Sequence, residues 1–120
     1  MDKPHKQLHA WQESMSLAQL IYQLTASFPA EEKFGLIAQL RRAAVSIPSN
    51  IAEGAARSTT RDYVHFLVVA RGSLCEMDTQ LELAVSLGYL PPQHPGIPAL
   101  NKTGKLLSAL ISSLRNKLKD

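Results

Sequence analysis

Hydrophobic side chains recur along this chain in alternating steps of three and four residues, a spacing that places them on one side of an α-helix. The pattern predicts helices over about 8–28, about 30–56, about 60–87 and about 99–117. It is most regular in the third segment, at Tyr63, Leu67, Ala70, Leu74, Met77, Leu81 and Ala84. No segment alternates with the period of two that strands require, so the pattern indicates an all-α protein.

Residues with known terminal preferences predict where these helices begin and end. Pro29 ends the first, and Thr59 with Asp62 three positions later forms a variant of the capping box before the third. Gly88 suits the position just after the third helix, where a left-handed backbone is common. The stretch from Tyr89 to Pro98 is rich in proline and is predicted to be a loop.

Pro48 interrupts the second segment because proline lacks a backbone N–H and crowds the carbonyl of Ala44. The apolar pattern resumes at Ile51, which favours one helix kinked at Pro48, with two helices meeting there as the alternative. Mostly short connections favour antiparallel neighbours. We therefore predict one domain over residues 1–120, an antiparallel up-down-up-down four-helix bundle.

Composition narrows the class of protein further. Hydrophobic residues make up 45 % of the 120 residues, which is enough for a core and too many for a disordered chain. No apolar run approaches the roughly 20 residues of a membrane span, and the first residues lack the apolar stretch of a signal peptide. Together with the single Cys75, these features predict a cytoplasmic protein without a membrane partner.

No catalytic motif or metal-ligand spacing stands out. Cys75 has no nearby base, since His65 lies almost three turns away, and we interpret it as a small buried hydrophobe. His5 and His9 are interpreted as solvent-exposed residues without a metal. We predict no enzyme activity, no cofactor and no small-molecule substrate. An enzyme would instead need a pocket that gathers groups such as Glu53, Glu76 and a histidine.

Polar residues form a stripe beside the apolar side of the second and third segments. They recur at helical spacing, and we predict a structural or interface network of Arg42, Ser46, Asn50, Glu53, Ser73 and Glu76. Its expected ion pair joins Arg42 to Glu76, and small residues nearby let the two helices approach closely. The alternative is two ordinary solvated faces.

Basic residues slightly outnumber acidic ones, 13 against 10, which gives a net charge of +3. Phosphate binding requires several cations on one surface. The candidates for phosphate contacts are Arg41, Arg57, Arg61, Lys102, Lys105, Arg115, Lys117 and Lys119. The cations near the C terminus have an alternative role, which is to complement the dipole of the last helix.

Three stretches resemble one known family, the small proteins encoded within intervening sequences of bacterial 23S ribosomal RNA genes. The resemblance runs along nearly the whole chain and is strongest at Gln39–Ala43, Ser46–Gly54 and Ala70–Glu76. Its most specific string is Ile-Pro-Ser-Asn-Ile-Ala-Glu-Gly at 47–54.

This resemblance implies an antiparallel four-helix bundle that assembles as a homopentamer and has no enzyme activity or cofactor. The accessory proteins of diversity-generating retroelements look similar, and those are more basic pentamers that bind RNA and a reverse transcriptase. The resemblance therefore favours a self-associating module that binds structured RNA or other nucleic acid. A protein-binding scaffold without a nucleic-acid role is the alternative, and it would expose an apolar patch instead of a basic surface.

Overall fold

Four long helices make up most of the chain in a computed structural model that describes residues 3–119. The elements in order are the 3-10 helix η1 (Pro4–Gln7), α1 (His9–Thr25), the 3-10 helix η2 (Ala30–Glu32), α2 (Leu36–Ala55), α3 (Thr60–Ser86) and α4 (Gly96–Lys117). Because the described residues contain no strand, the all-α prediction is confirmed.

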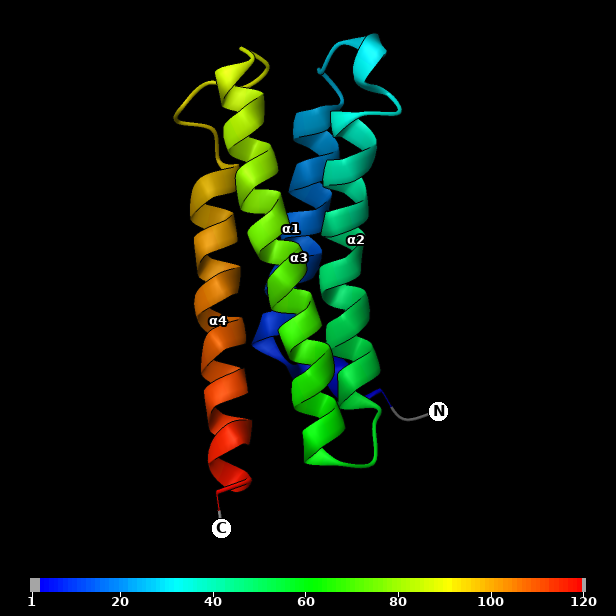
Figure 1. Ribbon diagram of the computed structural model, residues 1–120, viewed down its shortest axis with the longest axis vertical. Helices are drawn as coiled ribbons and strands as arrows, with labels where there is room; N and C mark the ends of the chain where they lie inside the picture. Colours follow the sequence, from blue (N-terminus) through cyan, green and yellow to red (C-terminus); the bar gives the residue numbers. More distant parts are fainter. Residues whose placement is uncertain (1–2, 120) are drawn as a thin grey trace.

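The helices alternate in direction, as Figure 1 shows, with the α2–α3 turn and the last residues of α4 at one end. Each helix packs against two others: α1 and α3 both contact α2 and α4. The bundle measures 50 × 28 × 20 Å along its principal axes. The predicted up-down-up-down four-helix bundle is therefore confirmed.

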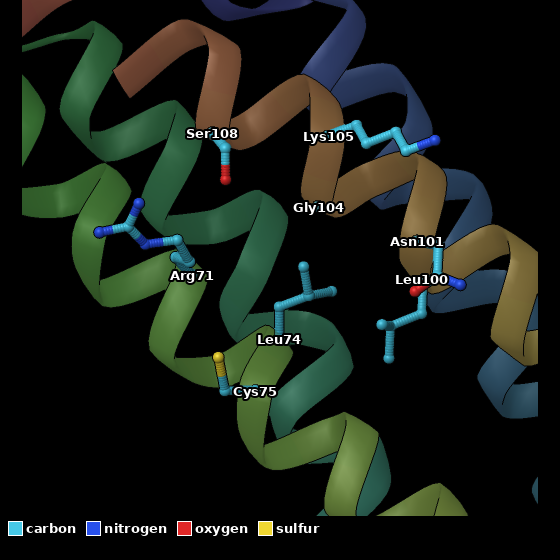
Figure 2. A pocket seen from close by; sticks show the side chains of 8 residues that line it. All are labelled: Arg71, Leu74, Cys75, Leu100, Asn101, Gly104, Lys105 and Ser108. Carbon is cyan, nitrogen blue, oxygen red and sulfur yellow. The ribbon is translucent and has the colours of Figure 1, made fainter. Parts of the chain in front are cut away.

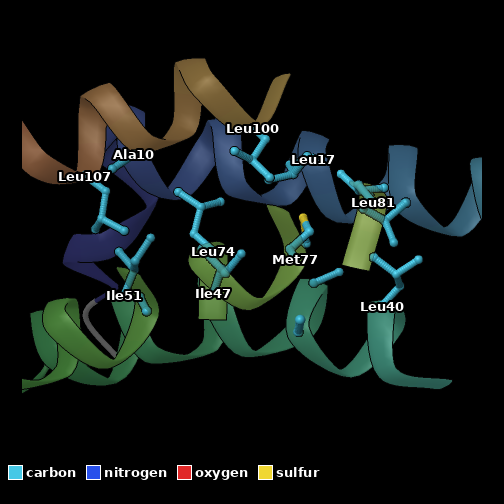
Figure 3. Packing of buried hydrophobic residues seen from close by; sticks show 14 of the residues in the cluster. Ala10, Leu17, Leu40, Ile47, Ile51, Leu74, Met77, Leu81, Leu100 and Leu107 are labelled. Carbon is cyan, nitrogen blue, oxygen red and sulfur yellow. The ribbon is translucent and has the colours of Figure 1, made fainter. Parts of the chain in front are cut away.

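The core contains the apolar stripes that the sequence spacing predicts (Figure 3). Fully buried side chains come from every helix: Leu17, Ile21, Leu40, Ile47, Ile51, Leu67, Met77, Leu81, Leu107 and Ile111. Burial of each large aliphatic side chain contributes about 1.5–3 kcal/mol, so this shared core accounts for most of the stabilisation of the bundle. None of the helices in residues 3–119 contains an apolar stretch that could span a lipid bilayer.

Pro48 lies inside α2 and is buried. Helical structure continues without a break from Leu36 to Ala55, so the chain forms one helix here and not two. Packing of Ile47 and Ile51 in the core stabilises both sides of the proline, which offsets the hydrogen bond that proline cannot donate.

α2 begins later than predicted, at Leu36 instead of near Ala30. Residues Ala30–Glu32 form the separate turn η2, and the Glu32 carboxylate accepts a hydrogen bond from the Leu36 N–H at 3.0 Å. The hydroxyl of Tyr89 donates to the other Glu32 oxygen at 2.9 Å. Glu32 therefore links the α1–α2 connection to the α3–α4 loop, and these hydrogen bonds, first that from Leu36, lower its pKa.

Both predicted ends of α3 are confirmed. The Thr59 hydroxyl accepts the Asp62 N–H at 3.1 Å, so threonine caps the helix. At the other end Gly88 has a φ of 80°, and the Tyr89 N–H reaches back to the Ala84 carbonyl at 2.9 Å. This is a Schellman ending, in which a residue with positive φ lets the chain turn away.

Two other boundaries were predicted wrongly. α1 ends at Thr25, before Pro29, and the Thr25 hydroxyl bonds back to the Ile21 carbonyl at 2.7 Å. α4 begins at Gly96, three residues before the predicted start, and Pro98 lies in its first turn. Proline is tolerated there because N–H groups in a first turn have no partner within the helix.

His94 is the residue that organises the start of α4. Only 2 % of its surface is exposed, and its Nδ1 accepts the Gly96 N–H at 3.1 Å. Its Nε2 has no hydrogen-bond partner among the described residues. Burial lowers the pKa of His94, because a charged ring there would lose its hydration.

We expect protonation of His94 to destabilise the fold. Its pKa in the folded protein is below the ordinary value of 6.5, so the unfolded chain binds a proton first as the pH falls. The stability that neutral His94 contributes is therefore fully present above about pH 6.5, the ordinary pKa of histidine. It is lost as the pH falls below 6.5 toward the lower pKa of the folded protein. Urea unfolding at several pH values from about 7 down to about 5 measures this loss.

The control is His94→Gln, which removes this imidazole and leaves the other three histidines in place. This variant should be less stable than the wild type at neutral pH, and the difference should shrink in acid. Parallel stability curves for the two proteins would contradict the prediction.

Candidate nucleic-acid interface

Cations gather at one end of the bundle, where the α2–α3 turn, the residues around η1 and the last turn of α4 lie (Figure 1). We call this surface the basic end and define it by Lys3, Lys6, Arg57, Arg61, Arg115, Lys117 and Lys119. The same stretches contain the acids Glu53 and Asp62. Antiparallel packing thus brings together cations that are far apart in the sequence.

The opposite end has the reverse balance. The α1–α2 connection contains Glu31 and Glu32 with Lys33, the last turns of α3 contain Asp78 and Glu82, and Arg41 lies at this end against the last turn of α1. Charge is therefore separated along the long axis of the molecule. A polyanion is attracted to one end and repelled from the other, which orients its approach.

Arg57 is held in place at the basic end. Its guanidinium forms an ion pair with Glu53, one turn earlier on α2, and lies over the Phe66 ring at 4.6 Å from the centroid. Its side chain remains 43 % exposed. Such stacking restricts a flexible side chain while leaving its outer N–H groups available to a phosphate.

The remaining cations of this end are exposed. Arg61 lies on the first turn of α3, and Arg115 and Lys117 lie on the last turn of α4. Within residues 3–119 none of these three forms an ion pair. Their charge is therefore uncompensated, and the two on α4 also complement its dipole.

Three of the predicted phosphate-binding residues lie elsewhere. Arg41 donates to the Thr25 hydroxyl at 2.9 Å and to the Tyr22 carbonyl at 3.3 Å, and it stacks on the Tyr22 ring. It therefore caps the C-terminal end of α1. Lys102 pairs with Glu13 at 3.0 Å and joins α4 to α1, while Lys105 lies on the middle of α4.

Part of the predicted polar network connects α2 to α3. The hydroxyls of Ser46 and Ser73 share a hydrogen bond at 2.9 Å. The Asn50 amide donates to the Ser46 carbonyl at 2.8 Å and to its hydroxyl at 3.0 Å. These short side chains let the two helices approach closely, and they satisfy polar groups that the contact would otherwise leave unpaired.

The predicted ion pair between Arg42 and Glu76 was wrong for the described chain: both residues are exposed and do not pair. Glu53 also leaves the network, because it pairs with Arg57 on its own helix. The network contains only short polar side chains because Arg42, Glu53 and Glu76 are exposed and lie outside the contact between Ser46 and Ser73. Exposed pairs gain little energy, so they do not draw such residues together.

Cys75 is exposed, so its interpretation as a buried hydrophobe was wrong. It lies on the side of α3 that borders α4 and not on the core stripe. His9 is exposed, whereas His5 is half-buried and packs against the Trp11 ring at 4.9 Å. Among residues 3–119 no three His, Cys, Asp or Glu side chains are grouped so that they could hold a metal ion.

The residue that sequence reasoning missed is His94. A histidine within a proline-rich loop carries no periodic signal, and its only hint is the Gly96 two positions later, which begins a helix. Its role depends on contacts of the α3–α4 loop with the rest of the bundle.

Comparison with known proteins finds a matching family model and a solved structure of similar fold. A family model described as 23S rRNA-intervening sequence protein matches residues 6–111. A crystal structure of a protein with unknown function from the S23 ribosomal protein family, from Bacteroides thetaiotaomicron, is similar in fold with a TM-score of 0.64. The two chains are 19 % identical, over 92 % of this chain and 99 % of that one. No curated protein matches the sequence.

Proposed function

The chain belongs to the family of 23S rRNA-intervening sequence proteins, and from that premise we propose that it is a non-enzymatic, self-associating module whose basic end binds structured RNA. The observation that supports this most directly is the collection of cations at one end of the bundle. Each phosphate that a lysine or arginine neutralises releases condensed counterions, which favours binding without reading base sequence.

The form of the basic end suits a folded RNA. Its cations come from four separate segments, so they are spread across a surface and do not follow one helix. Phe66 lies under Arg57 on α3 and is partly exposed, and the exposed His65 ring packs against it with 5.4 Å between centroids. Within residues 3–119 this is one aromatic pair and not the row of rings that stacks successive unpaired bases. We therefore propose contacts to the phosphate backbone and recognition of RNA shape.

Self-association is supported by an apolar surface on α1 and α2. Met15, Tyr22 and Val45 are between 37 % and 47 % exposed, and a groove nearby is lined by Trp11, Ala18 and Pro48. Apolar surface of this kind commonly marks a protein–protein contact. Assembly would repeat the basic end in several copies, so that weak phosphate contacts act together. The resemblance to pentameric proteins makes five copies the proposed number.

Fluorescence anisotropy with a structured RNA and with duplex DNA, across a salt series, tests the RNA proposal. We expect affinity for the RNA to fall steeply as salt rises. Arg61→Glu combined with Lys117→Glu should weaken binding about tenfold or more and reduce the slope of the salt dependence by roughly two units per subunit engaged. Both residues are exposed and unpaired in the described chain, so the fold should be retained.

The matched control is Lys33→Glu, which reverses one charge at the opposite end of the bundle and is compared with Arg61→Glu alone. It should leave RNA affinity nearly unchanged. Equal losses of RNA affinity from substitutions at the two ends would mean that net charge, and not the basic end, governs binding. Sedimentation of the same samples gives the mass, and a monomer of 13.2 kDa at micromolar concentration would remove self-association.

A protein scaffold without RNA is the second candidate, and the exposed apolar surface of α1 and α2 is what favours it. Absence of RNA binding at low salt, together with a sedimentation mass above that of the monomer, would support this function in place of the first.

A further inference from the structure

An open groove of about 500 Å³ runs between α3 and α4 on the side of the bundle (Figure 2). Its apolar floor is formed by Leu74 from α3 and Leu100 from α4, and Cys75 lies beside them. Neither the basic end nor the apolar surface of α1 and α2 contributes to its lining. The groove is thus a separate feature of the molecule.

Gly104 lies on α4 opposite Leu74 and lines the groove with it. A Cβ at this position would come 3.2 Å from Leu74 Cδ2, which is closer than ordinary contact, so glycine here lets the Leu74 side chain pack directly against α4. Glycine inside a helix is about 0.5–1 kcal/mol less favourable than alanine. Helix propensity therefore does not explain this residue, whereas the close contact between Leu74 and α4 does.

Arg71 and Lys105 lie at opposite edges of this apolar floor, one on each helix (Figure 2). In the described part of the chain, neither forms an ion pair or a side-chain hydrogen bond, whereas the nearby Lys102 pairs with Glu13. The acids Asp78 and Glu82 lie farther along α3, beyond the groove. The edges of the groove are therefore positive and uncompensated.

We propose that this groove is the docking site for an amphipathic helix of another protein, in which carboxylates flank a short apolar stripe. The groove follows α4 from Leu100 to Ser108, about 12 Å at 1.5 Å per residue, or two helical turns. A helix lying there presents apolar anchors at positions i, i+4 and i+7 to the floor. Its carboxylates then reach the arginine and lysine at the two edges, whose side chains are long enough to adjust.

The chemistry of the groove favours this occupant over the others available. RNA supplies phosphates for the edges but leaves the apolar floor without a complementary group. The groove on α1 and α2 of a second copy is lined without any carboxylate, and Arg41 stacks on Tyr22 beside it. Of these three occupants, the acidic helix with an apolar stripe matches both the floor and the edges.

The test uses Cys75, the only cysteine of the chain, as a reporter inside the groove. The probes are two synthetic helical peptides with leucine at i, i+4 and i+7, one flanked by glutamates and the other by lysines at the same positions. We measure the rate at which iodoacetamide alkylates the thiol of the full-length protein. At a concentration ten times its Kd, the glutamate peptide should slow alkylation about tenfold by mass action, and the lysine peptide should not.

Arg71→Glu and Lys105→Glu together reverse the charge at both edges of the groove. The double variant should therefore bind the lysine peptide in preference to the glutamate peptide. This variant should lose protection by the glutamate peptide, with affinity reduced about tenfold or more, and should gain protection by the lysine peptide. Such an exchange is not produced by a damaged fold, and thermal melts of the variant monitor folding independently. Arg42→Glu, an exposed change on another face, serves as the matched control.

Equal protection by the two peptides, or none by either, would overturn the proposal. Protection of Cys75 that grows with protein concentration alone would assign the groove to a second copy, and protection by structured RNA would assign it to nucleic acid. These outcomes leave the proposed role of the basic end intact, because they concern different residues.

Discussion

Leu81→Ala is expected to lower the free energy of unfolding by about 2–5 kcal/mol, because it removes buried methyl groups and leaves a cavity. Leu81 has no exposed surface and lies on the side of α3 that faces the centre of the bundle, among the residues of Figure 3. Its neighbours Met77 and Ala84 are equally buried, so few side chains are free to move into the space. Urea unfolding followed by helical circular dichroism measures the change.

Leu83→Ala is the matched control, since it is the same substitution two residues along the same helix. Leu83 is 48 % exposed, and its truncation should cost less than about 1 kcal/mol, within the range of most surface changes. Losses of similar size at both positions would mean that α3 is covered on its outer side in solution.

Gly54→Ala should also destabilise the protein, although alanine is the better helix former by about 0.5–1 kcal/mol. A Cβ at this position would lie 2.9 Å from Phe66 Cβ and 3.1 Å from the Tyr63 carbonyl oxygen. Those atoms belong to α3 and cannot move without displacing the helix. Overpacking of this kind costs about 1–3 kcal/mol, so we expect a net loss of up to about 2 kcal/mol.

Gly72→Ala tests the same substitution without the steric conflict. Gly72 lies in the middle of α3, is exposed, and a Cβ there would meet nothing within 4 Å. This variant should gain roughly 0.5–1 kcal/mol from helix propensity. If both variants became more stable by similar amounts, the close approach of α2 and α3 at Gly54 would be refuted.

Helix existence could be predicted from the sequence because it depends on residues that are neighbours along the chain. The apolar spacing of Leu67, Ala70, Leu74, Met77, Leu81 and Ala84 identifies the side of α3 that is buried. Caps are local in the same way, so Thr59 and Gly88 were identified correctly. The start of α4 was missed because a proline such as Pro98 is compatible with a loop and with a first helical turn.

The candidate site was only partly predictable, because the position of a cation in the sequence does not say which side chains surround it in the fold. Neighbours along the sequence do not distinguish Arg41 from Arg57, since an alanine lies within two residues of each. In the fold, Arg41 caps the carbonyl end of α1, whereas Arg57 stacks on Phe66 at the basic end. The exposure of Cys75 was missed for a related reason, since one step around the helix separates the core stripe from the α3–α4 groove.

By itself the sequence determined the helices, their buried sides and their antiparallel order, since periodic spacing, caps and short connections act over a few residues. The tertiary structure alone decided which charges meet. Arg57 and Arg115 lie close to one end of the bundle only because four helices alternate in direction, and Lys102 is neutralised only because Glu13 is its neighbour across α1 and α4. Electrostatic attraction and burial depend on distance in space, and in a bundle that distance is set by packing between helices and not by separation along the chain.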